Sequence, residues 1–249
     1  MPQIEGTFSQ FLKGKTALVT GGTSGIGAAI GRGLAEAGAK VTVTGVSQAE
    51  VDAAKSDPGF GDQQAELLDV RDNDAVKSLV GRFDRLDVLV NCAGAIRRAA
   101  EHDPEVFAQV VDINLNGSMR CCAAARPLLK QSGGAIVNIA SMLSFFGGGL
   151  VPGYSASKGG VAQLTKSLAI AYAADTIRVN AVAPGWIATP LTRALQDDLS
   201  RSQPIIDRTP MKRWGRPEDI AGAVVFLCSP AAAFVTGTIL PVDGGYLIS

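Results

Sequence analysis

Seven short apolar runs recur along the 249-residue chain, with helical patterns between them. Runs of this length, rich in Val, Ile, Leu and Ala, are typical of strands that are buried on both faces of a parallel sheet. They cover Ala17–Thr20, Val41–Thr44, Ala65–Leu68, Val88–Asn91, Ala135–Ile139, Arg178–Val182 and Ile239–Val242. The alternation predicts an α/β fold with a doubly wound, mostly seven-stranded parallel sheet. Since no repeat or linker divides the chain, we expect one domain over residues 1–249.

A glycine-rich turn follows the first apolar run. Gly21, Gly25 and Gly27 stand between this run and a helical pattern over Ala28–Gly38. Free backbone N–H groups and the positive end of a helix form a cradle for a pyrophosphate, and glycine allows the ligand to come close. A glycine-rich turn alone is as often only a tight turn. The strand before it and the helix after it favour a dinucleotide site in a Rossmann-type domain.

Tyr154 and Lys158 stand four residues apart, so in a helix they share one face. A free phenol has a pKa of about 10 and exchanges protons poorly at neutral pH. Because a nearby cation favours the phenolate, we expect Lys158 to lower the pKa of Tyr154 toward the working range. Ser141 and Asn114 lie upstream of this pair. By itself the Tyr-x-x-x-Lys pattern is more often a surface pair.

Taken together, these motifs resemble the short-chain dehydrogenase/reductase family over essentially the whole chain. The similarity includes the turn Thr20–Gly27, the pair Asp69-Val70, the segment Asn91–Gly94 and the loop Pro184–Thr189. The nearest branches are the sugar-acid (2-deoxygluconate or gluconate) dehydrogenases and the 3-oxoacyl carrier-protein reductases. Cys92 replaces the second Asn of the family's Asn-Asn-Ala-Gly segment. A thiol does not reproduce an amide's hydrogen bonds, so local bracing of the central strand is in doubt.

The resemblance implies a role for each member of a catalytic tetrad. Tyr154 would be the acid in carbonyl reduction and the base in alcohol oxidation, and Lys158 would also hold the nicotinamide ribose. Ser141 would bond the substrate oxygen, and Asn114 would hold a water that links Lys158 to solvent. The implied cofactor-binding residues are Gly21, Thr23, Ser24, Gly25, Ile26, Gly27, Ser47, Asp69, Val70, Asn91, Ala93, Gly94, Tyr154, Lys158, Pro184, Gly185, Ile187 and Thr189.

The choice between NAD and NADP depends on the end of the second strand. An acidic residue there binds the ribose of NAD, whereas a nearby Arg accommodates the phosphate of NADP. This chain has neither in Gly45-Val46-Ser47, and Ser24 stands where NADP-preferring relatives often carry a cation. A phosphate without a cationic partner is poorly compensated. NAD is therefore slightly favoured over NADP, although Ser47 and Gln48 leave phosphate binding open.

The substrate signal comes from Arg97 and Arg98, which follow the Asn-Cys-Ala-Gly turn and resemble the sugar-acid branch. Arg binds carboxylates well through bidentate hydrogen bonds. A solvated basic pair or a subunit contact is an equal alternative. Segments 141–145, 207–210 and 213–215 resemble the same branch. Further substrate candidates are Phe145, Phe146, Trp186, Arg201 and Arg208, and residues 191–217 are predicted to form a substrate lid.

The leading prediction is an NAD(P)-dependent oxidoreductase that interconverts a secondary alcohol and a carbonyl on a small sugar acid or keto-sugar acid. An alternative is a 3-oxoacyl thioester (acyl carrier protein) reductase, which a basic patch of Arg97, Arg98, Arg126 and Lys130 would favour. A remote alternative is a catalytically silent dinucleotide-binding regulatory protein. The intact tetrad argues against it.

Charge and cysteine content bound the partners and the compartment. Lys and Arg number 23, as do Asp and Glu, and this balance argues against nucleic acid or an anionic membrane as a partner. We see no secretory signal or membrane span, and the four cysteines show no metal or disulfide spacing, so we expect a cytoplasmic protein with free thiols. The single histidine, His102, makes a metal site unexpected. Family resemblance implies a homotetramer with contacts through Gly160–Ala173 and Thr238–Ser249.

Overall fold

The computed structural model describes residues 10–249, whose seven strands form one sheet in the order β3-β2-β1-β4-β5-β6-β7. All six neighbouring pairs are parallel. The strands are β1 (Thr16–Thr20), β2 (Lys40–Gly45), β3 (Gln64–Leu67), β4 (Val88–Asn91), β5 (Ala135–Ile139), β6 (Arg178–Pro184) and β7 (Ile239–Val242). The predicted doubly wound, seven-stranded parallel sheet is confirmed.

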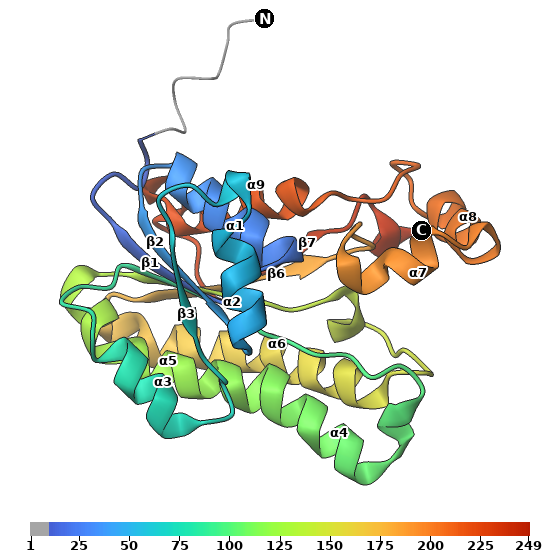
Figure 1. The fold of residues 1–249 in the computed structure, drawn as a ribbon, viewed down its shortest axis with the longest axis horizontal. Helices are drawn as coiled ribbons and strands as arrows, with labels where there is room; N and C mark the ends of the chain where they lie inside the picture. Colours follow the sequence, from blue (N-terminus) through green and yellow to red (C-terminus); the bar gives the residue numbers. More distant parts are fainter. Residues whose placement is uncertain (1–9) are drawn as a thin grey trace, which may run out of the picture.

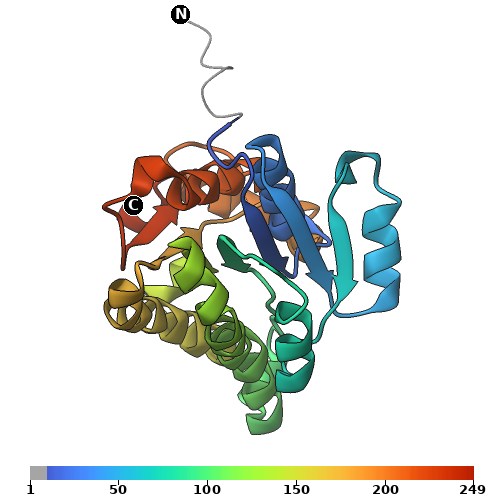
Figure 2. The same cartoon turned by 90° about the vertical axis from the view of Figure 1, so that its left-hand side faces the viewer.

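Helices cover both faces of this sheet (Figure 1). On one face α1 (Gly25–Glu36) packs against α9 (Pro217–Cys228), and Leu34 and Ile220 belong to the same apolar core. The other face carries α3 (Asn73–Val80), α5 (Gly117–Ser132) and α6 (Pro152–Tyr172), whose apolar side chains form a second core. Figure 2 shows the sheet between these two layers. Burial on both sides explains why the strands are almost uniformly apolar.

The remaining elements are short and lie around the sheet. They are α2 (Gln48–Lys55), α4 (Pro104–Val111), α7 (Arg193–Gln196), α8 (Leu199–Arg208), a π-helix (Asp112–Asn116) and the 3₁₀ turns Pro58–Phe60, Ala100–His102, Met142–Ser144, Ala173–Asp175, Pro190–Thr192, Pro230–Ala232 and Tyr246–Ile248. The helix predicted over Ala28–Gly38 begins earlier, at Gly25, because Ser24 is its N-cap. The left-handed Gly38 follows the C-cap Ala37.

Strand order reverses between β1 and β4, which are hydrogen-bonded neighbours although two strands separate them in the chain. In such sheets ligands bind beyond the carboxyl ends of the strands, at this switch point. The loops that follow β1, β4, β5 and β6 all leave the sheet at that edge. Helices α7 and α8 project beyond the sheet near the C-terminus (Figure 1).

Within residues 10–249, no helix is both long enough and apolar enough to cross a membrane. The same part of the chain holds no cluster of three or more His, Cys, Asp or Glu side chains arranged for a metal ion. All four cysteines are free, and Cys121, Cys122 and Cys228 are buried.

Candidate active site

Three elements bring the predicted tetrad together at the carboxyl edge of the sheet. Tyr154 and Lys158 lie in the first turns of α6, whose first residue, Pro152, has no N–H of its own that would need a partner. The Lys158 Nζ lies 5.5 Å from the centre of the Tyr154 ring and donates to the Ile139 carbonyl oxygen at 2.6 Å. Ser141 follows β5, and its side chain forms a hydrogen bond with that of Tyr154. The spacing predicted from the sequence therefore corresponds to contact in space.

Burial dominates the protonation of this pair. It raises the pKa of Tyr154 to about 12, although the hydrogen bond with Ser141 acts in the opposite direction. Burial also lowers the pKa of Lys158 to about 8. The expected lowering of the Tyr154 pKa by Lys158 is therefore wrong for this structure. The loss of water around the buried phenol is the largest cause, and the Lys158 ammonium, which donates to the Ile139 carbonyl, does not offset it.

Asn114 lies in the π-helix Asp112–Asn116 and is buried, with 1% of its surface exposed. Its Nδ2 donates to the Ala95 carbonyl and to the Ser157 hydroxyl, both at 3.0 Å, while its Oδ1 accepts from the Ala95 N–H at 2.7 Å. A π-bulge often marks a functional site. Here it lets one amide brace the loop after β4 against α6. The predicted role in holding a water stays a prediction.

The glycine turn after β1 leaves no room for side chains. A Cβ at Gly21 would lie 2.6 Å from the Ala93 Cα, and one at Gly27 would lie 2.1 Å from the Gly21 oxygen. Gly21 and Gly25 also have φ values of +64° and +53°, which favour glycine. Ser24 makes no side-chain cap bond, so the N–H groups that open α1 are left for a ligand. A pyrophosphate fits this cradle.

The loop after β6 closes over the same turn. A Cβ at Gly25 would lie 3.5 Å from the Thr189 Cγ2, so Thr189 stands directly beside the glycine turn. Gly185 is packed against Asp243, whose Cα would lie 2.6 Å from an added Cβ. Ile187 is buried and pairs with Gly215 through an isolated bridge. These contacts bring the loop after β6 beside the glycine turn, at the edge of the sheet where a dinucleotide would bind.

A carboxylate that the sequence analysis missed lies at the end of β2. The Glu50 Oε2 accepts a hydrogen bond from the Val46 N–H at 2.9 Å, and a Cβ at Gly45 would lie 3.2 Å from that oxygen. Ser47 caps α2 and accepts from the Glu50 N–H. The acidic residue therefore reaches back from the helix, which is why the strand end itself looked neutral.

Two predicted cofactor residues have other partners. The Asn91 Nδ2 donates to the Asn138 Oδ1 at 2.8 Å and contacts the Cys122 Sγ at 3.2 Å. Its side chain is buried between β4, β5 and α5 and braces the sheet, and the predicted contact of Asn91 with the cofactor stays a prediction. Asp69 is paired with Arg71 at 2.6 Å, and this hydrogen bond lowers its pKa despite partial burial.

Aromatic side chains from distant segments gather where the loops after the neighbouring strands β5 and β6 leave the sheet. Phe146 stacks on Tyr246 with ring centres 6.4 Å apart, and Trp186 packs edge-on against Tyr246 and Trp214. Arg208 lies 4.1 Å from the centre of the Tyr246 ring. Tyr246 and Trp214 were not among the predicted site residues, since nothing in the local sequence marks them. Phe145, which was predicted, is 52% exposed and lies in none of these ring contacts.

The predicted basic patch is not formed. Arg97 and Arg98 are exposed on the loop that leaves the carboxyl end of β4. Arg126 and Lys130 instead pair with Asp175, at 2.6 and 2.7 Å, just before β6 begins. The two pairs therefore lie at opposite edges of the sheet. Only Arg97 and Arg98 are near the tetrad.

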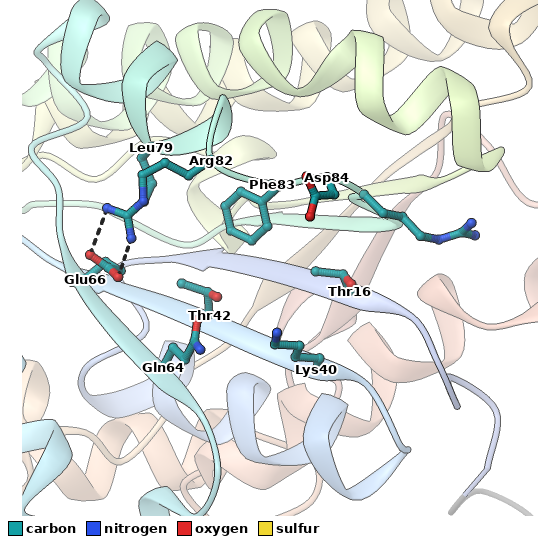
Figure 3. A pocket seen from close by; sticks show the side chains of 10 residues that line it. Thr16, Lys40, Thr42, Gln64, Glu66, Leu79, Arg82, Phe83 and Asp84 are labelled. Carbon is teal, nitrogen blue, oxygen red and sulfur yellow. Dashed lines mark hydrogen bonds and ion pairs between the residues drawn. The ribbon is translucent and has the colours of Figure 1, made fainter.

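A separate cavity of about 230 Å³ lies at the opposite edge, where β1, β2 and β3 begin (Figure 3). Thr16, Lys40 and Gln64 are the first residues of those strands and line it. An ion pair between Arg82 and Glu66, 2.6 Å long, stands at its side. None of the predicted site residues is part of it.

Comparisons with known proteins agree with this geometry. The sequence model of a family described as enoyl-(acyl carrier protein) reductase matches residues 21–247. A 2-dehydro-3-deoxy-D-gluconate 5-dehydrogenase of Bacillus subtilis is 43% identical over 247 residues, covering 95% of this chain and 96% of the relative. A cis-4-hydroxycyclohexanecarboxylate dehydrogenase of Sinomonas cyclohexanicum is 44% identical over 241 residues, covering 93% and 96%.

Among solved structures, a gluconate 5-dehydrogenase of Burkholderia cenocepacia in complex with NADP and tartrate superposes with a TM-score of 0.89. It is 35% identical and covers 97% of this chain and 99% of its own. The chain belongs to the short-chain dehydrogenase/reductase family. It is an NAD(P)-dependent oxidoreductase that acts on CH–OH groups, so the silent regulatory alternative does not hold.

Proposed function

We propose that this enzyme interconverts the secondary hydroxyl and the ketone of a small hydroxy acid, with a sugar acid or keto-sugar acid as the leading class. One observation carries the proposal. Arg97 and Arg98 are exposed beside the tetrad, and the Arg97 N–H is joined to the Tyr154 N–H by a single carboxylate, that of Glu101. Two relatives are named for carboxylates that bear a hydroxyl or a keto group. A guanidinium suits such a carboxylate.

In the proposed mechanism the nicotinamide, when bound, supplies or accepts the hydride. The Ser141 hydroxyl donates a hydrogen bond to the substrate oxygen and holds that oxygen beside Tyr154. Tyr154 gives its phenolic proton to that oxygen during reduction. Because burial raises its pKa to about 12, the phenol is protonated at neutral pH and carries the proton that reduction requires. Lys158 remains largely charged near neutrality, since its pKa is about 8.

The proposal is tested with Arg97→Gln and Arg98→Gln on a keto-deoxy sugar acid. Loss of a charge-assisted bond predicts a KM raised about tenfold or more for the acid, with little change for a neutral ketone of similar size. Arg82→Gln, in the ion pair at the opposite edge, is the matched control. Equal KM values for the acid in wild type and both variants would remove the carboxylate assignment.

We further propose that NAD is preferred over NADP. Support comes from the Glu50 carboxylate at the end of β2, 2.9 Å from the Val46 N–H, where a phosphate would meet negative charge. Solved relatives do bind NADP, which makes the preference a property to test in this chain. Val46→Arg combined with Glu50→Gln should lower the KM for NADPH about tenfold relative to NADH. An unchanged ratio would show that these positions do not select the cofactor.

A second candidate is a 3-oxoacyl thioester reductase. The description of the matching family model favours it, because that description names an acyl carrier protein. The separation of Arg97 and Arg98 from Arg126 and Lys130 weakens it, since the predicted patch for an acidic carrier is split between two edges. Turnover of an acetoacetyl thioester, compared with the sugar acid in one assay, distinguishes the two candidates.

We also propose a cytoplasmic homotetramer of single-domain subunits in which residues 191–217 form the substrate lid. The exposed Ile170 on α6 and Ile248 at the C-terminus, 81% and 90% exposed, support subunit contacts through these two segments. The free thiols suit a reducing compartment. Helix α8, within the lid, begins at the exposed Leu199. Sedimentation at micromolar concentration as a monomer would contradict the assembly.

A further inference from the structure

A buried carboxylate stands between the predicted substrate loop and the predicted catalytic helix. Glu101 lies in the 3₁₀ turn Ala100–His102 and is 1% exposed. Its Oε1 accepts a hydrogen bond from the Arg97 N–H, and its Oε2 accepts one from the Tyr154 N–H, each at 2.7 Å. Neither oxygen has a lysine or arginine side chain as a partner within residues 10–249. The negative charge of Glu101 is therefore compensated by hydrogen bonds from backbone N–H groups.

Glu101 caps the N-terminus of α6, which has no N-cap side chain of its own. The N-cap of that helix is Val151, which has no side chain that can accept a hydrogen bond. Tyr154 is the third residue of the helix, where the N–H has no partner inside the helix. A carboxylate at a helix N-terminus is also favoured by the helix dipole. Glu101 therefore supplies from a distant segment the cap that the local sequence lacks.

Further bonds fasten the same two segments. The Ala99 N–H donates to the Leu150 carbonyl at 2.8 Å, and the His102 Nε2 is bonded to the Gly149 carbonyl at 3.0 Å. Ala99 has a φ of +66°, a strained value that persists only where surrounding contacts enforce it. A Cβ at Gly153 would lie 3.3 Å from the Glu101 Oε2, so the helix passes close to the carboxylate.

We propose that Glu101 is a positioning residue, whose carboxylate fixes the loop of Arg97 and Arg98 to the first turn of the helix that carries Tyr154. The inference rests on the proposed function in that Tyr154 moves the proton. Glu101 contacts the Tyr154 backbone and leaves its phenol to Ser141. A shift of either segment would separate the substrate carboxylate from the proton donor. Misplacement of about 1 Å can cost about a hundredfold in rate.

The test compares Glu101→Gln and Glu101→Asp with Glu105→Gln, an exposed glutamate on the same segment. The Gln variant keeps one acceptor oxygen and turns an NH₂ group toward the other N–H. We expect its kcat to fall about tenfold and its KM for the acid to rise, while NADH binding stays within about twofold of wild type. The Asp side chain keeps the charge but is too short to join both N–H groups, so the kcat of this variant should fall as well. Glu105→Gln should behave as wild type.

The pH profile separates positioning from a general loss of folded enzyme. The groups that act on the Tyr154 phenol are Ser141, Cys92, Glu101 and, above its ring, Lys158. The Glu101 charge disfavours the phenolate, so its removal in the Gln variant should move the proton-transfer limb of kcat/KM to lower pH. The Asp variant should keep the wild-type limb. A variant that is only less stable would contain less active protein, but the pH at which its kcat/KM changes would be that of the wild type.

Wild-type kcat, KM and pH profile in Glu101→Gln would overturn the inference. If that variant does not fold, Glu101→Asp decides, and wild-type kinetics there would overturn it equally. Rates are measured on whichever carbonyl compound the wild type reduces fastest. A failure of the proposed substrate class therefore shows in the wild type, whereas a failure of this inference shows in the ratio of variant to wild type.

Discussion

The cofactor side and the substrate side of this candidate site are built in different ways. Around the glycine turn, backbone meets backbone, and an added Cβ at Gly21 or Gly27 would lie within 2.6 Å of a neighbouring main-chain atom. Around Phe146 and Arg208, side chains from four separate segments meet through ring contacts. Backbone contacts tolerate no substitution, whereas side-chain contacts can be exchanged one at a time. This difference explains why the family is readable from the sequence and the substrate is not.

The largest effect is expected at the residue that both sides share. Tyr154→Phe removes the proton donor and leaves the ring in place, so kcat should fall about a thousandfold. NADH affinity should stay within a few-fold of wild type, as measured by quenching of protein fluorescence. Activity within tenfold of wild type would show that another group moves the proton. Tyr154 would then not be the residue that links the cofactor side to the substrate side.

The next effect tests the rigidity of the cofactor side. Gly21→Ala forces a Cβ to within 2.6 Å of Ala93 at a φ of +64°, so NADH binding should weaken about a hundredfold or the protein should lose stability. Gly222→Ala in α9, where an added Cβ meets nothing within 4 Å, is the matched control. That variant should be slightly more stable, by about 1 kcal/mol. Equal NADH binding and equal stability in Gly21→Ala and Gly222→Ala would contradict the proposed rigidity of the cofactor side.

The smallest effect tests the adaptability of the substrate side. Phe146→Ala removes one ring contact with Tyr246 and should raise the KM for the hydroxy acid about fivefold, since aromatic pairs contribute about 1 kcal/mol. NADH binding and the midpoint of thermal unfolding should change little. A large drop in unfolding temperature would instead place Phe146 in the structural core.

The family resemblance predicted Ser141 and Asn114. Local pattern was enough to predict the strands and the shared helix face of Tyr154 and Lys158, because buried parallel strands are continuous apolar runs and a helix fixes which residues lie on one side. It was not enough where a partner comes from far along the chain. Glu101 stands between Ala100 and His102 with no motif around it, and only the fold shows that it caps α6. The Asn91 side chain turned inward for the same reason, because its partner Asn138 is on another strand. The pKa of Tyr154 depended on burial, which no spacing reveals.

The most direct test is the initial rate of NADH and NADPH oxidation by the wild-type enzyme, with a keto-deoxy sugar acid against an acetoacetyl thioester. Our account predicts fast turnover of the sugar acid, slow turnover of the thioester and the higher rate with NADH. The Arg97 and Arg98 loop would then be the carboxylate side of the site. Preferential reduction of the thioester would contradict the account and assign this chain to the carrier-protein branch.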